Sequence, residues 1–223
     1  MMKHRVLAVG LAAVLTLEAN VHAFAGTIVA ENYPAETTIT ICQDSPTMFT
    51  DEQLSELVAT APDISETRST ITIPDRRITD AELIAWSDEY WELGGINAFE
   101  LEVVRLINIE RATYGLHPLA LNPTLSMAAR FHSHQMADLA FFSHRSPHHG
   151  RGTYRVEMFG HENIREYAWG VQENIASTTR SPERAVHVWM NSPGHRATIL
   201  GEYFLTIGIG AVQGGGTTAK FGL

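Results

Sequence analysis

The end of the chain carries the pattern that most restricts its fold. Apolar residues alternate with small or polar ones over residues 205–212, glycines follow at 214–216, and residues 217–223 form a second run. This arrangement predicts a β-hairpin. Gly208 and Gly210 fall on one face of the first strand, which predicts the close approach of another element. Helix signals precede the hairpin, so the sequence predicts a layered α+β domain.

The helix signals lie at defined places along the chain. Each combines an N-cap residue with a glutamate three residues later or with a proline at the first helical position. They are Thr79 with Glu82, Asn97 with Glu100, Asn122 with Pro123, and Ser181 with Pro182. We therefore expect at least four helices between residues 79 and the hairpin.

The first 25 residues predict a secretory signal peptide. Lys3 and Arg5 provide a positive start, and residues 6–17 form an apolar run shorter than the ~20 residues of a membrane span. An A-x-A cleavage pattern ends at Ala25, and a second candidate ends at Ala23. We expect a secreted, extracellular protein; the alternative is an uncleaved anchor. No later segment is apolar enough for a stable membrane span.

The net charge and the cysteine content exclude some classes of partner and of covalent cross-link. The formal net charge is −9 and no Lys/Arg cluster is present, which argues against nucleic acid and anionic membranes as partners. Loss of residues 1–25 would leave a charge of about −10. Cys42 is the only cysteine, so internal disulfides are excluded and a spare thiol or an intermolecular pairing remains.

Residues 26–78 read as a linker or spacer. They are rich in Thr, Ser, Asp and Pro, which predicts loose order. Short alternating runs at 37–41 and 70–73 predict single strands, and Thr50 with Gln53 predicts a short helix. A helical lead-in over 79–96 and a domain over 97–223 complete the predicted organisation.

Three short polar segments carry the candidate chemistry. Residues 142–147 hold His144, residues 172–176 hold Glu173, and residues 189–196 hold His195. Two imidazoles and a carboxylate that meet would form a metal site or an acid/base site. His195 is expected on the first turn of a helix, where the positive dipole end favours the neutral imidazole that binds metals or accepts a proton.

Other polar residues have two interpretations each. His132 lies on an apolar helical stripe and is expected to be a hydrogen-bonded core residue rather than a ligand. Asn108, in mid-helix, is either on a solvated face or a buried brace for a neighbouring loop. Loop histidines rank below His144 as metal ligands; they are His148, His149 and His161.

Taken in order, these motifs resemble those of the CAP superfamily, also called SCP-like. The family includes cysteine-rich secretory proteins, antigen 5 and plant pathogenesis-related proteins, and the similarity is to its bacterial, disulfide-free secreted branch. It covers about residues 97–223. The motifs are Asn108-x-x-Arg111, Phe142-Ser143-His144-x-Ser146-Pro147, Glu173-Asn174-Ile175-Ala176, Trp189-Met190-Asn191-Ser192-Pro193-Gly194-His195-Arg196 and the glycine-rich hairpin.

The resemblance implies an α-β-α sandwich with a central antiparallel sheet. It also implies a cleft with His144, Glu173 and His195 that in several members binds zinc or another divalent ion. Residues expected to support it are Asn108, Arg111, Ser143, Asn174, Trp189 and Ser192. The chain departs from the family where Ser192 replaces a second glutamate and Gln172 replaces a glycine. The first departure weakens a two-carboxylate mechanism.

Three functions follow from these residues. The first is a secreted binding protein whose cleft takes a divalent metal and a peptide, lipid or glycan without turnover. The second is a metal-assisted, peptidase-like hydrolase with Glu173 as general base, although H-E-x-x-H is missing and no serine triad is evident. The third is a structural hydrogen-bond network of His144, Glu173 and His195 with no ligand.

Overall fold

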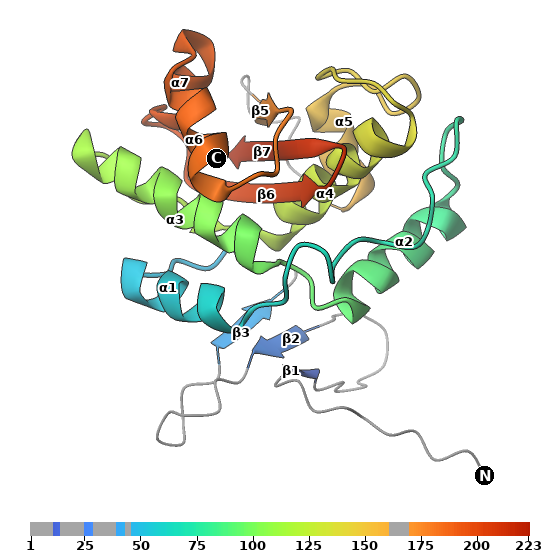
Figure 1. Ribbon diagram of the computed structural model, residues 1–223, viewed down its shortest axis with the longest axis horizontal. Coiled ribbons are helices and arrows are strands. Elements are labelled where there is room, and N and C mark those ends of the chain that lie inside the picture. The colour runs from blue at the N-terminus through green and yellow to red at the C-terminus, as the bar shows by residue number, and fades with distance from the viewer. Residues whose placement is uncertain (1–10, 14–24, 29–38, 43–45, 161–169) are drawn as a thin grey trace.

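A computed structural model describes residues 11–13, 25–28, 39–42, 46–160 and 170–223 (Figure 1). The helices are α1 (Asp51–Thr60), α2 (Asp80–Glu92), α3 (Ala98–Thr113), α4 (Pro123–Asp138), α5 (Gly152–Met158), α6 (Pro182–Met190) and α7 (Pro193–Ile199). The strands are β1 (Leu11–Ala13), β2 (Ala25–Ile28), β3 (Ile39–Cys42), β4 (Ala120–Leu121), β5 (Gln172–Ala176), β6 (Thr206–Val212) and β7 (Gly216–Gly222).

The main sheet has the strand order β4-β6-β7-β5. The predicted hairpin is confirmed as β6 and β7, which pair antiparallel with Ile209 opposite Ala219. β5 pairs antiparallel with the outer side of β7, and only the short β4 runs parallel to its neighbour. The strands β1, β2 and β3 form a separate antiparallel sheet, in which β3 confirms part of the strand predicted at 37–41.

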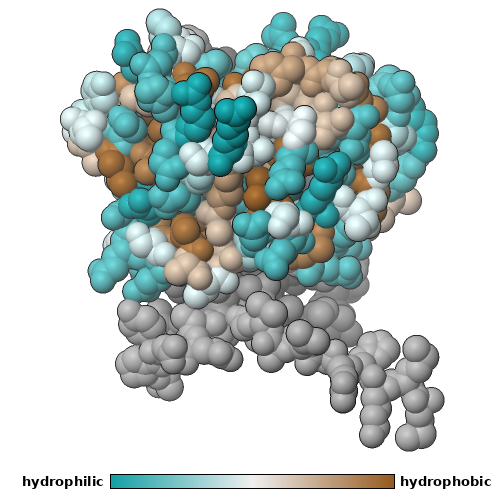
Figure 2. Space-filling model, in the orientation of Figure 1, coloured by the Kyte–Doolittle hydropathy of each residue, from teal (hydrophilic) through white to brown (hydrophobic). Residues whose placement is uncertain are grey.

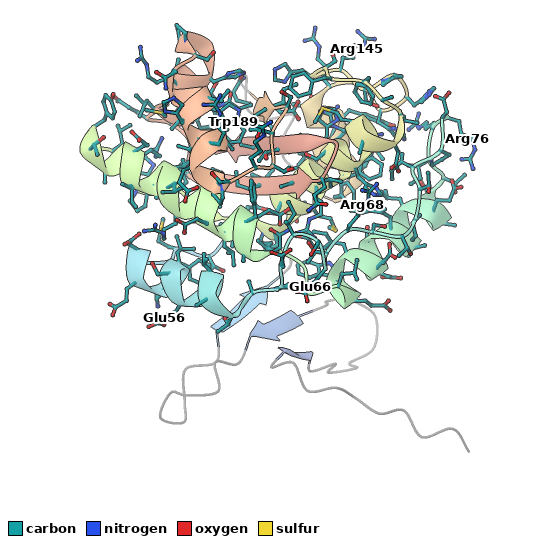
Figure 3. The ribbon with its side chains drawn as sticks, in the orientation of Figure 1. Glu56, Glu66, Arg68, Arg76, Arg145 and Trp189 are labelled. Carbon is teal, nitrogen blue, oxygen red and sulfur yellow. The ribbon has the colours of Figure 1, made fainter. Side chains whose placement is uncertain are left out.

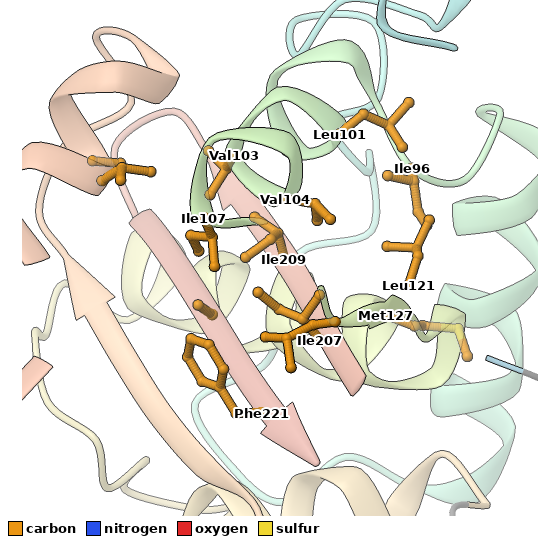
Figure 4. Close-up of a cluster of buried hydrophobic side chains, with 14 of the residues drawn as sticks. Ile96, Leu101, Val103, Val104, Ile107, Leu121, Met127, Ile207, Ile209 and Phe221 are labelled. Carbon is orange, nitrogen blue, oxygen red and sulfur yellow. The ribbon is translucent and has the colours of Figure 1, made fainter. Parts of the chain in front are cut away.

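Helices cover both faces of the main sheet, which confirms the predicted α-β-α arrangement. On one face, Ile207 and Ile209 pack with the apolar stripe of α3, including Val103 and Ile107 (Figure 4). The other face lies against α4. A side chain at Gly208 or Gly210 would overlap the α4 backbone, so the predicted close approach is confirmed.

Local capping sets the helix starts. The three capping boxes at Thr50, Thr79 and Asn97 each form both of their hydrogen bonds. Asn122 accepts from the backbone of Leu125 at the start of α4, with proline at the first helical position. These bonds satisfy amide groups that an isolated helix end would leave unpaired, so the boundaries follow from short-range sequence.

Residues 46–78 differ from the loosely ordered spacer that the sequence predicts. Leu54 and Leu57 of α1 are buried and pack in the same hydrophobic core as α3. The strand predicted at 70–73 is irregular backbone, in which Ile73 is buried and its amide donates to Asp138 at 2.7 Å. The few apolar residues of this polar segment thus pack against helices that lie later in the chain.

The predicted signal peptide lies mostly outside the described residues, and its cleavage stays a prediction. Within the described ranges, none of the helices is long and apolar enough to cross a membrane. On the face shown in Figure 2, hydrophobic residues occur in small groups between hydrophilic ones.

Candidate functional site

The centre of the site is the side chain of Glu173 on β5. Lys220 lies directly opposite on β7, and Arg155 approaches from α5. Oε2 of Glu173 accepts from Nζ of Lys220 at 2.5 Å and from a guanidinium nitrogen of Arg155 at 2.7 Å. The side chains of both cations are fully buried and that of Glu173 is 6% exposed. One carboxylate is therefore shared between two buried cations.

The second oxygen of Glu173 faces the loop that carries His144. Nδ1 of His144 lies 3.1 Å from Oε1, which makes it the donor to an ionised carboxylate. The His144 side chain remains 53% exposed. Nε2 of the buried His132 lies 3.0 Å from the carbonyl of Ser143 and 3.8 Å from Oε1. Glu173 and His132 together fix the position of His144.

The charges around Glu173 decide its protonation. Burial alone would raise the pKa of Glu173, but Lys220, the hydrogen bond from His144 and Arg155 outweigh it and hold that pKa well below its usual range. Burial lowers the pKa of Lys220 to about 8, although Glu173 opposes the shift. Burial and Arg155 lower the pKa of His132 to about 3, so its imidazole is neutral near pH 7.

His195 lies on the first turn of α7, as predicted. Its main-chain carbonyl accepts from Nδ2 of Asn174, the neighbour of Glu173, at 3.0 Å. Burial is the larger cause that lowers the pKa of His195, and the charge of His144 adds to it. Both effects favour the neutral form of the His195 ring. Its Nδ1 is buried and has no hydrogen-bond partner in the described part of the chain.

Asn108, Arg111 and Trp189, which the sequence analysis expects to support the site, make contacts elsewhere in the domain. Nδ2 of Asn108 donates to the carbonyl of Leu119 at 3.1 Å and its Oδ1 accepts from the Leu119 amide at 2.8 Å, which is the brace geometry. The buried Arg111 donates to the carbonyls of Ile199 and Gly201, where α7 ends. Trp189 is buried in the core (Figure 3).

Two residues beside the site have smaller roles. The hydroxyl of Ser143 accepts from the amide of Arg145 at 3.1 Å and so shapes the loop next to His144. Ser192 is the N-cap residue of α7, but its side chain makes no capping hydrogen bond.

The loop histidines hold the N-terminal segment in place instead of joining His144. His148 pairs with Asp75 at 2.7 Å. Nε2 of the buried His149 accepts from the amide of Ile78 at 3.0 Å. His161 lies outside the described residues. Residues 75–78 thus anchor the loop whose first part carries His144.

The donor set suits a metal only in part. Among the described residues, no group of three His, Cys, Asp or Glu side chains is placed to hold a metal ion. Glu173 is engaged by its two cations, and through Nδ1 it orients His144, as carboxylates commonly do for metal-binding histidines. Nε2 of His144 and the ring of His195 are the donors that this arrangement leaves.

A pocket of about 590 Å³ opens beside His144 and Glu173. It lies between the His144 loop, the start of α5 and the start of β5. The described residues of its lining are His144, Arg145, Arg151, Gly152, Thr153, Val171, Gln172 and Glu173.

Arg155 and Lys220 are site residues that the sequence analysis did not identify. Arg155 lies in a segment without clear periodicity, and its partners are remote in the sequence. Lys220 had a signal, because a lysine inside an otherwise uncharged terminal strand requires a buried counter-charge.

Fold and site together define an α-β-α domain with a pocket lined in part by His144 and Glu173. A sequence model of the cysteine-rich secretory protein (CAP) family matches residues 104–221, and the chain belongs to this family. Several bacterial proteins are similar to this chain. YkwD of Bacillus subtilis (strain 168), an uncharacterized protein, is 42% identical over 120 residues, which cover 54% of this chain and 45% of YkwD.

Two further bacterial proteins are similar to part of this chain. YlbC of the same strain, an uncharacterized membrane protein, is 32% identical over 126 residues, covering 56% of this chain and 35% of YlbC. A crystal structure of an extracellular SCP-domain protein from Bacillus anthracis shares the fold with a TM-score of 0.51 and 29% identity, covering 60% of this chain and 42% of that one. The chain thus spans less than half the length of each of these relatives.

Proposed function

We propose that this chain is an extracellular binding protein whose cleft takes a divalent metal, such as zinc, and a peptide, lipid or glycan ligand without turnover. His144 and His195 would hold the metal, and Glu173 would orient His144. The extracellular location is supported by the signal pattern of residues 1–25 and by the extracellular SCP-domain relative from Bacillus anthracis.

The state of Glu173 carries the proposal. A general base works best when its pKa lies near the operating pH. The carboxylate of Glu173 accepts from Lys220, Arg155 and His144, and its pKa lies well below the usual range. Such a carboxylate is a weak base, and both of its oxygens already accept hydrogen bonds from the protein. It serves as an anchor, which favours binding over hydrolysis.

The metal would bind in an open site. Two imidazoles provide fewer ligands than the three or four of most zinc sites, so water or the ligand itself would complete the shell. The metal would supply a Lewis-acid contact to an oxygen of the ligand. The neutral form of His195 and its buried Nδ1 without a partner in the described structure are consistent with this role.

Zinc titration of the full chain by calorimetry tests the proposal. We expect micromolar binding that His144→Ala and His195→Ala each abolish. His187→Ala is the matched control, because His187 is exposed on α6 and its substitution should leave the isotherm unchanged. Melting temperatures of all variants show whether a loss of binding comes from misfolding.

The outcomes separate the three functions. Absence of zinc binding, together with a large loss of melting temperature in both site variants, would support the structural network and reject the proposal. Turnover of a peptide or ester that disappears in Glu173→Gln while the variant stays folded would support the hydrolase.

A further inference from the structure

The pocket beside Glu173 has an unusual charge for this protein. The chain as a whole carries −9, yet Arg145 and Arg151 both line the pocket. Arg145 and Arg151 are both exposed residues. Within the described part of the chain, neither guanidinium has an ion-pair partner. Four other arginines of the described residues do pair with a glutamate: Arg76 with Glu82, Arg105 with Glu102, Arg130 with Glu100, and Arg155 with Glu173.

The buried layer beneath the pocket adds to its positive charge. Among the described residues of the lining, Glu173 is the acidic one, and it is already shared by Arg155 and Lys220. One negative charge therefore faces two buried positive charges. With Arg145 and Arg151 at the surface, the described groups around the pocket sum to a local excess of positive charge. In a partly enclosed space, such an excess attracts anions more strongly than it would on an open surface.

The pocket also has room and shape for a ligand group. Its volume of about 590 Å³ is within the range of small-molecule sites. Gly152 is one of its lining residues, and an added Cβ there would be 3.1 Å from Oε2 of Glu173 and 3.2 Å from Nζ of Lys220. The absence of a side chain at Gly152 leaves the buried ion pairs close to the pocket.

We infer that this pocket binds an anionic group of the ligand, a carboxylate or a phosphate, through Arg145 and Arg151. Guanidinium groups bind both anions through paired N–H donors. The inference rests on the proposed function, since it names the chemistry of the ligand on the side of the cleft that His144 and Glu173 line. It does not depend on the metal, because neither arginine is a proposed metal ligand.

The test is titration of the full chain, without metal, with two small probes followed by NMR. One probe is inorganic phosphate; the other is N-acetyl-dialanine with a free carboxylate, compared with its carboxamide. We expect the pocket amides to shift with phosphate, with the free acid, or with both, and not with the carboxamide. Arg145→Gln with Arg151→Gln should weaken this binding at least about tenfold, and raised salt should weaken it in the wild type.

Arg180→Gln is the matched control, because Arg180 is exposed away from the pocket lining and its loss should leave the titration unchanged. Equal binding of free acid and carboxamide with no phosphate binding, or full binding by the folded double variant, would overturn the inference. Zinc isotherms of the wild type and of the double variant keep the two proposals apart. In the wild type, zinc binding without anion binding rejects only the anion pocket, and anion binding without zinc binding rejects only the metal. The double variant should lose anion binding and keep its zinc isotherm.

Discussion

Glu173 and Lys220 face each other across two neighbouring strands, with Oε2 and Nζ 2.5 Å apart. The side chain of Lys220 is fully buried and that of Glu173 is 6% exposed. Because Arg155 joins the same oxygen, removal of the carboxylate would leave two buried cations without a counter-charge. The ion pair therefore couples the stability of the sheet to the geometry of the cleft.

This coupling predicts a non-additive pair of substitutions. Glu173→Gln should reduce the free energy of unfolding by about 3–5 kcal/mol, because it leaves buried charges unpaired. Lys220→Met should reduce it less, since Glu173 keeps Arg155 and His144. The double variant, measured by urea unfolding, should show a coupling energy of at least about 1 kcal/mol. Strict additivity would mean that the two side chains do not interact in solution.

A second prediction concerns mild acid. Burial lowers the pKa of His132 to about 3 and that of His149 to about 4. In the unfolded chain the pKa of each histidine is about 6.5. Between these values the unfolded chain binds protons that the folded chain does not, so stability falls as the pH falls from about 6.5 to 4. Each histidine contributes at most about 1.4 kcal/mol per pH unit. In urea unfolding at several pH values, His149→Gln should show a shallower slope; an unchanged slope would contradict this assignment.

The contact between α4 and the sheet gives a third prediction. Gly210→Ala places a methyl group into the backbone at Arg130, and we expect a loss of at least about 3 kcal/mol or failure to fold. Gly194→Ala is the matched control, because its added Cβ meets open space within α7. There alanine should be neutral or stabilise by up to about 1 kcal/mol. Similar effects at both glycines, by thermal unfolding, would contradict the packing.

The N-terminal segment gives a fourth prediction. If α1 is part of the domain core, Leu54→Ala should lower the free energy of unfolding by about 2–5 kcal/mol, as for other buried leucines. Ile84→Ala on α2 is the control, since Ile84 is 60% exposed and its truncation should change stability by less than about 0.5 kcal/mol. A negligible effect at Leu54 would show that α1 is only loosely attached.

Short-range signals account for most of what the sequence could predict. Capping boxes and the glycine-rich hairpin depend on residues a few positions apart, so Thr79, Asn97 and Asn122 marked helix starts correctly. The contact between His144 and Glu173 was predicted from the order of the motifs that resemble the CAP superfamily, because their separation in the sequence does not indicate a contact.

What the sequence could not predict depends on long-range packing. The spacer interpretation of residues 26–78 followed from polar composition, yet in the described part of that segment Leu54 and Leu57 pack in the same core as α3. Arg155 and Lys220 have no local pattern that names Glu173 as their partner. The assignment of Glu173 as a candidate base failed to anticipate these two cations, which change the chemistry that the carboxylate can perform.

The central claim is that Glu173 is an ionised anchor for His144. Carbon-13 NMR of the Glu173 side-chain carboxyl, followed through a pH titration of the full chain, tests it directly. The account predicts that this carboxyl stays ionised from neutral pH down to well below the ~4.3 of an ordinary glutamate. A carboxyl that titrates at or above that value would contradict the account and return Glu173 to the role of a general base.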